Sequence, residues 1–127
     1  MLIKVTSVSF SGLKTNRIDV EVNIADRGLP VFDIVGLPNK AVAESKERVR
    51  TALANSGFCI PGNRITVNLA PADIPKEGAF YDLPIAVGIL SEAYALEVPP
   101  DSVFFGELSL DGSLRHTKGS LLAALFT

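Results

Sequence analysis

The residues best placed for chemistry stand between a short alternating strand and an apolar helix, in the segment 68–90, NLAPADIPKEGAFYDLPIAVGIL. Glycine-containing strand–loop–helix junctions often hold an enzyme's nucleophile, because the backbone can approach a substrate there and a helix N-terminus favours anions. Gly78, Ala79, Phe80 and Tyr81 occupy the places where a serine or cysteine would be expected. The junction therefore has the frame of an active site without a nucleophile.

The loop itself carries two charged residues, Lys76 and Glu77, followed by Gly78. A Lys-Glu-Gly loop ahead of a helix could bind phosphate or contact a partner. It could equally be a solvated loop tip in which glycine supplies backbone freedom, and this structural interpretation is favoured. Asp82, expected to cap the following helix, completes the group of predicted partner-contact residues. That group is Lys76, Glu77, Gly78 and Asp82.

A second set of candidates is basic and lies in and after the first predicted helix. Its members are Lys46, Arg48, Arg50 and Arg64. Such a patch could contact DNA, and Arg48 and Arg50 are the DNA candidates. Glu44 and Glu47 lie among them, so a salt-bridged, solvated face is the favoured alternative. Glu44 and Arg48 are spaced as a helical ion pair, worth about 0.3–0.5 kcal/mol.

No other set of residues indicates a catalytic or metal centre. Walker A, GxGxxG, CxxC and HExxH motifs are absent from the sequence. His116 has no other ligand types clustered near it, so we interpret it as a surface histidine. Cys59 lacks a neighbouring cation or histidine and is predicted to be a packed, unreactive thiol. We therefore expect no catalytic, metal-binding or cofactor-binding residue in this fragment.

Composition sets broad limits on the class of protein. The chain of 127 residues is long enough for one domain with a core, and its net charge of −2 argues against a strongly basic nucleic-acid footprint. One cysteine excludes an internal disulfide and fits a reducing cytoplasm. No signal peptide is recognisable, and the apolar run 83–90 is far shorter than the roughly 20 residues that span a bilayer. We expect a cytoplasmic protein without a membrane partner.

Alternating apolar residues predict three strands at the start of the chain, over 2–10, 17–24 and 31–35. Gly12 and the segment 27–30 supply turns between them. Strands joined by tight turns pair with their neighbours in sequence. These three are therefore expected to form an antiparallel sheet with one solvated face.

Helices and strands alternate in the rest of the chain. A helix is expected over 39–55 with Asn39 as its N-cap, and a strand follows over 65–69. Asp82 is expected to cap a largely buried helix that the Pro99-Pro100 pair closes. Where the loop meets this helix, one of the two neighbouring aromatic residues is expected to cover the core.

A fifth strand over 103–110, a tight turn at Asp111-Gly112 and the start of a third helix over 118–127 complete the pattern. The last helix has no C-cap or polar tail, so we expect the chain to have been cut from a longer protein. The order of elements favours a single α+β domain over 1–127. It would be an α/β two-layer sandwich, with a mixed sheet and helices on one face.

Three blocks of sequence together resemble one family, the N-terminal domain of magnesium-chelatase-like AAA+ ATPases of the competence protein ComM group. The blocks are GLPNKAVAESKERVRTALANSGF over 36–58, ITVNLAPADIPKEGAFYDLPIAVGIL over 65–90 and FFGELSLDGSLRHTKG over 104–119. They follow one another in the expected order. The pairing of PAD-x-PKEG with DLPIA is hard to obtain by chance, so the match is specific.

The resemblance implies a fold like the proteolytic domain of Lon protease, within the ribosomal-protein-S5-domain-2-like group. In Lon-type proteases a serine follows the PK-(D/E)-G loop, and a lysine lies in the helix after a GE-x-x-L-x-G segment. Here that loop runs from Pro75 to Gly78, the serine position falls at Phe80, and the lysine position falls near Leu121. Both members of the catalytic dyad are absent, so the resemblance implies no peptidase activity.

Proteins similar to this one carry an ATPase module after this domain and work as hexameric motors that drive DNA branch migration in recombination and natural transformation. The resemblance therefore implies a non-catalytic domain that serves assembly or DNA and motor coupling. Its partners would be its own AAA+ module and the neighbouring subunits of a homo-hexamer, with DNA as a further candidate. ATP and magnesium would be cofactors of the parent protein, and none would be bound by this fragment.

Two alternatives stay open at this stage. One is a degenerate Lon-type serine peptidase, for which Ser109 and Lys118 would be the only candidate pair. The other is a subunit of magnesium chelatase itself, although metal-binding clusters are missing from the sequence.

Overall fold

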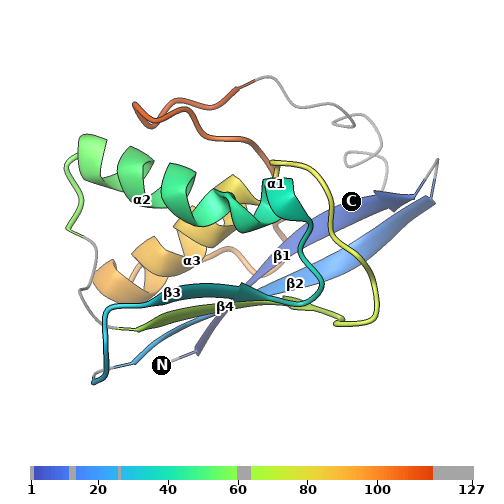
Figure 1. Ribbon diagram of the computed structural model, residues 1–127, viewed down its shortest axis with the longest axis horizontal. Helices are drawn as coiled ribbons and strands as arrows, with labels where there is room; N and C mark the ends of the chain where they lie inside the picture. The colour runs from blue at the N-terminus through green and yellow to red at the C-terminus, as the bar shows by residue number, and fades with distance from the viewer. Residues whose placement is uncertain (1, 12–13, 26, 60–63, 116–127) are drawn as a thin grey trace.

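The computed structural model describes residues 2–11, 14–25, 27–59 and 64–115 (Figure 1). A four-stranded sheet forms one layer, and the helices α2 (Ser45–Asn55) and α3 (Asp82–Tyr94) lie together over one of its faces. The predicted α+β class, with a mixed sheet and a two-layer arrangement, is confirmed. Among the helices in these ranges, none combines the length and apolar character needed to cross a membrane.

The first two strands form an antiparallel hairpin, as their alternation predicted. β1 (Leu2–Ser11) and β2 (Lys14–Ile24) pair along their length, with Val5 opposite Val20. Alternate side chains of β2 are buried against the helices, and the residues between them are partly or fully exposed. The buried members are Ile18, Val20, Val22 and Ile24.

The third strand does not continue this hairpin, so the predicted antiparallel arrangement of three successive strands is wrong. β3 (Phe32–Val35) pairs in parallel with β4 (Ile65–Ala70), and β4 pairs antiparallel with β2, which gives the order β1-β2-β4-β3. The helices between β3 and β4 cross over one face of the sheet, and a crossover of this kind aligns the two strands in parallel. β4 thereby takes the place beside β2 that a tight turn would have given to β3.

The helix predicted from Asn39 onward is present but interrupted. α1 (Lys40–Ala43) is capped by Asn39, whose Oδ1 accepts a hydrogen bond from the Val42 backbone N–H at 2.9 Å. A break at Glu44 separates α1 from α2. Beyond the end of α2, Gly57 has a φ of 89°, the left-handed conformation expected of a glycine that terminates a helix.

The helix α3 packs on β1 and β2 and brings its apolar side chains into the core. Gly88 permits a close approach to the sheet, because a Cβ at this position would lie 2.4 Å from Val22 Cγ2. The helix ends before Ala95, which has a φ of 54°. The predicted end at Pro99-Pro100 is therefore several residues too late, and Leu96 lies beyond the helix with 54% of its surface exposed.

The fifth strand predicted over 103–110 does not form. A hydrogen bond from Phe104 N–H to Thr6 O, at 2.9 Å, joins this segment to the edge of β1. The chain then leaves the sheet, because Gly106 makes its backbone hydrogen bonds with the start of α3. The turn predicted at Asp111-Gly112 is present, with a φ of 94° at the glycine. The helix predicted over 118–127 lies outside the described residues.

Candidate functional site

The loop between β4 and α3, which holds most of the predicted contact residues, is closed by a buried lysine. Lys76 has no exposed surface, and its Nζ donates a hydrogen bond to the Pro71 carbonyl. Its backbone pairs with the segment ahead of α1: Lys76 N–H donates to Leu37 O at 3.1 Å, and Lys76 O accepts from Asn39 N–H at 3.0 Å. Burial lowers the pKa of Lys76, and the charge of Asp73 acts in the opposite direction. Lys76 therefore holds the loop together from inside.

The two residues after this lysine form the outer part of the loop. Glu77 is exposed, so its carboxylate is available to a partner. Gly78 has a φ of 89°, which favours glycine, and a Cβ there would lie 3.0 Å from Phe80 Cε1. The backbone freedom predicted for Gly78 is confirmed.

Two stacked aromatic rings occupy the position that the resemblance matches to the Lon serine. Phe80 lies against Tyr81, with the ring centroids 4.5 Å apart. Tyr81 is fully buried, as predicted for an aromatic residue that covers the core. Burial raises the pKa of the Tyr81 hydroxyl. Hydrocarbon therefore fills the place where a nucleophile would stand.

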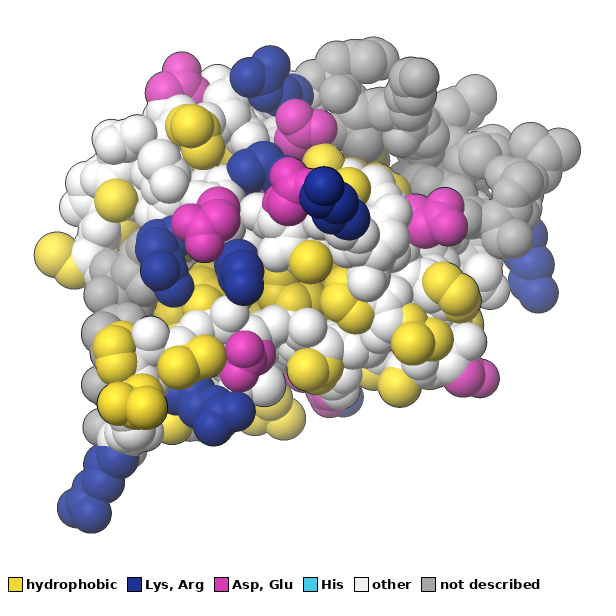
Figure 2. All heavy atoms as spheres, viewed as in Figure 1, with side chains coloured by type: hydrophobic (Ala, Val, Ile, Leu, Met, Phe, Trp, Pro, Cys, Tyr) yellow, Lys and Arg dark blue, Asp and Glu magenta, His cyan; other side chains and the backbone are white. Residues whose placement is uncertain are grey.

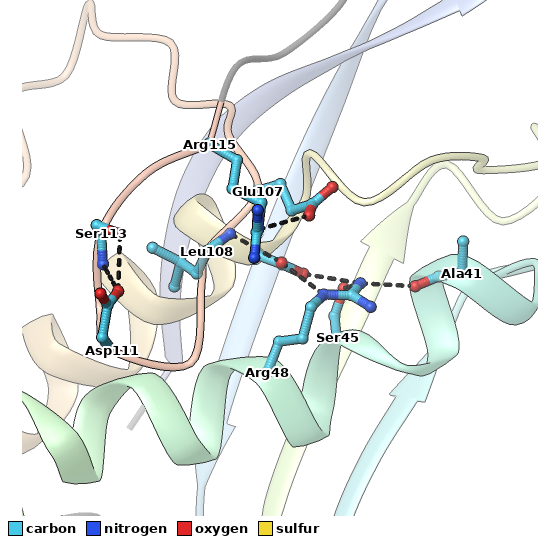
Figure 3. Close-up of polar contacts among 9 residues, drawn as sticks. Ala41, Ser45, Arg48, Glu107, Leu108, Asp111, Ser113 and Arg115 are labelled. Atoms are coloured by element: carbon cyan, nitrogen blue, oxygen red, sulfur yellow. Dashed lines mark hydrogen bonds and ion pairs between the residues drawn. The ribbon is translucent and has the colours of Figure 1, made fainter.

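A buried ion pair joins the first turn of α3 to α2 (Figure 3). Arg48 Nε lies 2.7 Å from Asp82 Oδ2, and Arg48 Nη2 lies 3.1 Å from Asp82 Oδ1. Asp82 is fully buried, and its Oδ2 also accepts from the Leu108 backbone N–H at 3.0 Å. Arg48 Nη2 donates further to Ala41 O at 2.8 Å and to Ser45 Oγ at 3.2 Å. This cluster connects both helices and the segment that contains Leu108.

Two local predictions about these residues are wrong. Asp82 is the first residue of α3 rather than its N-cap, because its carboxylate is directed to Arg48. Tyr81 takes the cap position and makes no side-chain capping bond. Arg48 pairs with Asp82 instead of Glu44, and the hydrogen bond to Asp82 is the main cause that raises the pKa of Arg48. The two partners are 34 positions apart, a contact that helical spacing could not reveal.

The N–H groups at the start of α3 are already bonded within the domain. Asp82 N–H donates to Ala79 O at 3.2 Å. Leu83 N–H donates to Gly106 O at 3.0 Å, and Pro84 has no N–H. A helix N-terminus binds an anion through free N–H groups. The first three residues of α3 therefore lack the donors of the anion site that the loop sequence suggested.

The residues predicted to contact DNA lie in different surroundings. Arg48 belongs to the buried ion pair, whereas Arg50 is exposed on α2 with its guanidinium carbon 5.7 Å from the centre of the Phe32 ring. Arg64 pairs with Asp33 at 3.4 Å. Figure 2 shows basic and acidic side chains interspersed on this face of the molecule, among hydrophobic ones. Of the two DNA candidates, Arg50 is the one displayed at the surface.

The residues of the alternative peptidase are only partly described. Ser109 lies in the turn that includes Asp111-Gly112, where its N–H donates to Ser113 O at 2.8 Å. Lys118, the lysine position near Leu121, and His116 lie outside the described residues.

The one cysteine differs from its prediction. Cys59 is exposed rather than packed, and its backbone N–H donates to the Tyr94 hydroxyl at 2.9 Å. Its position follows the end of α2, where the chain runs over the surface. In the ranges that the structure describes, no three His, Cys, Asp or Glu residues are grouped so that they could hold a metal ion.

Comparison with known proteins defines the family of this α+β domain. The family model described as subunit ChlI of magnesium chelatase matches residues 20–127. The chain therefore belongs to the family of proteins like magnesium-chelatase subunit ChlI.

Individual relatives are bacterial proteins, one of which is named a competence protein. It is 47% identical over 116 residues to competence protein ComM of Haemophilus influenzae, an alignment that covers 90% of this chain and 23% of that protein. It is 46% identical over 115 residues to the protein YifB of Escherichia coli, covering 89% of this chain and 22% of that protein. A Mycobacterium tuberculosis protein is 40% identical over 121 residues, with coverages of 94% and 24%. The chain thus spans less than a quarter of the length of these relatives.

Proposed function

We propose that this chain is the non-catalytic N-terminal domain of a hexameric, magnesium-chelatase-like AAA+ ATPase that acts on DNA in recombination or natural transformation. In this proposal the domain has a Lon-like fold and serves subunit assembly or the coupling of DNA to the motor. The observation that carries it is the 47% identity to competence protein ComM across 90% of the chain. ATP and magnesium would bind elsewhere in the parent protein, in the cytoplasm and without a membrane partner.

The packing around the loop supports a role without chemistry. Lys76 and Asp82 are charged groups that could act on a substrate, yet both are fully buried and bonded within the domain. Phe80 stands at the matched serine position. An acid, base or nucleophile must come within hydrogen-bond reach of the substrate. These groups are instead arranged to hold the loop and the start of α3 in place.

Two exposed residues are the contact candidates that remain at the surface. Glu77 presents a carboxylate at the loop and would contact a neighbouring subunit or the ATPase module. Arg50 presents a guanidinium on α2 and would contact the DNA backbone. Gly78, Asp82 and Arg48 would act through the positions that they impose on the loop and helices.

The proposal is tested in the full-length gene product that contains this chain. Rates of ATP hydrolysis and of branch migration at a DNA junction are measured for Glu77→Ala and Arg50→Ala, which alter exposed side chains. We expect Glu77→Ala to lower both rates by weakening assembly. We expect Arg50→Ala to lower branch migration while ATP hydrolysis without DNA is unchanged. The control is Glu97→Ala, an exposed carboxylate outside the loop; unchanged rates in both test variants would overturn these contact assignments.

A further inference from the structure

Leu37, just beyond the end of β3, has a conformation and an exposure that the domain itself does not explain. Its φ is 56°, and among the described residues other than glycine only Ala95 also has a positive φ. This left-handed conformation costs free energy in a residue with a Cβ, and a residue ahead of a proline is normally extended. Leu37 precedes Pro38, and 53% of its surface is exposed. The strained backbone therefore displays an apolar side chain at the surface, where little burial offsets the cost.

The neighbouring loop holds Leu37 in this conformation and places a carboxylate beside it. Leu37 O accepts a hydrogen bond from Lys76 N–H at 3.1 Å, and Asn39 N–H donates to Lys76 O at 3.0 Å. The two segments run in parallel here, with Pro38 beside Lys76. Lys76 is buried, whereas Glu77 after it is exposed. Leu37 and Glu77 thus form one exposed patch, called here the acidic patch. Strain that the surroundings maintain is a feature of functional surfaces.

A patch of the opposite charge lies where β3 begins. Leu29 and Val31 are 77% and 39% exposed there. Arg64 lies beside the same turn, because a Cβ at Gly28 would be 3.9 Å from Arg64 Cβ. The Arg64 side chain is 57% exposed, and its ion pair with Asp33 is a surface pair of small energetic value. Its guanidinium can therefore accept another carboxylate. Leu29, Val31 and Arg64 are called here the basic patch.

We propose that the acidic patch of one copy docks on the basic patch of the next copy, head to tail. Leu37 packs against Leu29, and the Glu77 carboxylate pairs with the Arg64 guanidinium. Figure 1 shows the turn before β3 and the loop between β4 and α3 at opposite ends of the molecule, so each copy can contact two neighbours. Contacts between unlike patches close into rings, whereas a two-fold contact ends at a dimer. The inference rests on the hexamer proposed above and names the neighbouring subunit as the partner of Glu77.

Disulfide cross-linking in the full-length gene product tests the head-to-tail contact. Exposed cysteines, Cys59 among them, are first replaced by serine. The double variant Leu29→Cys/Leu37→Cys should then form a ladder of cross-linked species under mild oxidation, since the contact brings the two Cα atoms within the roughly 7 Å that a disulfide spans. Each single variant should remain uncross-linked, because like patches do not meet. A double variant without a ladder, or Leu37→Cys that cross-links to itself, would overturn the proposal.

Exchange of the two charges tests the ion pair, by sedimentation of the full-length product over a range of concentrations. Glu77→Arg and Arg64→Glu should each weaken subunit association at least about tenfold, because like charges then meet at every contact. The double variant should recover most of the loss, because the pair is restored with its charges exchanged. The control is Glu97→Arg, an exposed carboxylate outside both patches, which should leave association unchanged. No recovery in the double variant, or equal weakening by the control, would contradict the pairing.

Two substitutions of Leu37 separate the contact from the fold. Leu37→Gly and Leu37→Ala both remove the apolar side chain, so both should weaken association at least about tenfold. Only alanine keeps a Cβ in the left-handed conformation, so Leu37→Gly should have the higher urea midpoint in the 127-residue chain. Association that follows the urea midpoint instead would overturn the contact role of Leu37. Association unaffected by every change, in a product whose branch migration still needs the domain, would overturn this contact and leave the proposed function standing.

Discussion

Lys76 and Asp82 carry ionisable groups in a part of the domain from which water is excluded. Each is held by a different kind of partner: a backbone carbonyl accepts from the lysine, whereas the aspartate accepts from a guanidinium and a backbone N–H. A buried charge that loses its partner is strongly destabilising. The stability of the domain should therefore respond to changes at Arg48, and to pH through Lys76.

Replacement of Arg48 tests the buried ion pair. Arg48→Ala leaves the fully buried Asp82 carboxylate without its cation, so we expect the free energy of unfolding to fall by about 3 kcal/mol. Urea denaturation measures the change. The control is Arg17→Ala, which removes an exposed pair with Asp19 and should cost at most about 1 kcal/mol. Equal losses in the two variants would contradict the structural role of Arg48.

Titration of Lys76 gives the domain a pH dependence of definite sign. The pKa of Lys76 lies below its ordinary value of 10.5 in the folded chain. Between the two values the unfolded chain binds more protons, so the free energy of unfolding rises with pH. Relative to Lys76→Met, the wild-type chain should therefore gain stability as the pH rises from neutral towards 10.5. Urea midpoints measured in pairs across this range check it, and a constant difference would contradict the burial of a charged lysine.

At the scale of elements, the contact between α3 and the sheet depends on a residue without a side chain. Gly88 faces Val22 on β2, and a Cβ there would approach Val22 Cγ2 to 2.4 Å. Overpacking of a core usually costs about 1–3 kcal/mol. The change from glycine to alanine also raises helix propensity, which stabilises the helix by about 1 kcal/mol. This gain offsets only part of the larger overpacking costs.

A double-mutant cycle tests this contact. Gly88→Ala should lower the free energy of unfolding by up to about 2 kcal/mol, since neither the helix nor β2 can move away without opening the core. In a Val22→Ala background the same change should be neutral or stabilising, because the methyl group it meets has been removed. Thermal or urea unfolding of the four proteins measures the coupling. Additive effects would show that α3 does not approach the sheet this closely.

Sequence pattern predicted the elements that depend on local periodicity and failed where distant contacts decide. The alternation in β1, β2 and β4 and the Asn39 cap were read correctly. The strand that pairs with β3 was predicted wrongly. The residues of β3 do not show whether its neighbour in the sheet is β2, reached by a turn, or β4, reached by a crossover. The segment 103–110 has the apolar content of a strand, yet only Phe104 bonds to β1, and Gly106 makes its backbone hydrogen bonds with Phe80 and Leu83 around the start of α3.

The candidate site shows the same division between local and distant contacts. Arg48 falls on the inward side of α2, between buried Ser45 and buried Ala52, and this position was a sign that its charge needed an internal partner. Nothing in the local spacing identified that partner as Asp82. The sequence also did not predict the burial of Lys76, because a Lys-Glu-Gly loop is typical of a solvated surface. Lys76 is buried because the loop folds back so that Nζ donates to the Pro71 carbonyl.

At the scale of the whole molecule, one face of the sheet is covered by the helices, whereas the edge at β3 is not paired with another described strand. The helices and the segment 104–108 cover one face of the sheet and hold the loop between β4 and α3 in place. The β3 edge and exposed Glu77 and Arg50 remain available to other chains. A domain of this kind is suited to hold parts of a larger assembly in position, which is the role proposed here.

The central claim is that this domain couples a motor to DNA without performing chemistry itself. The most direct measurement compares ATP hydrolysis and DNA branch migration by the full-length gene product, by the product without this domain, and by the purified 127-residue chain. We predict that removal of the domain abolishes branch migration and leaves ATP hydrolysis measurable, while the chain alone hydrolyses neither ATP nor an unstructured protein. Branch migration that persists at full rate without the domain, or hydrolysis by the chain alone, would contradict this account.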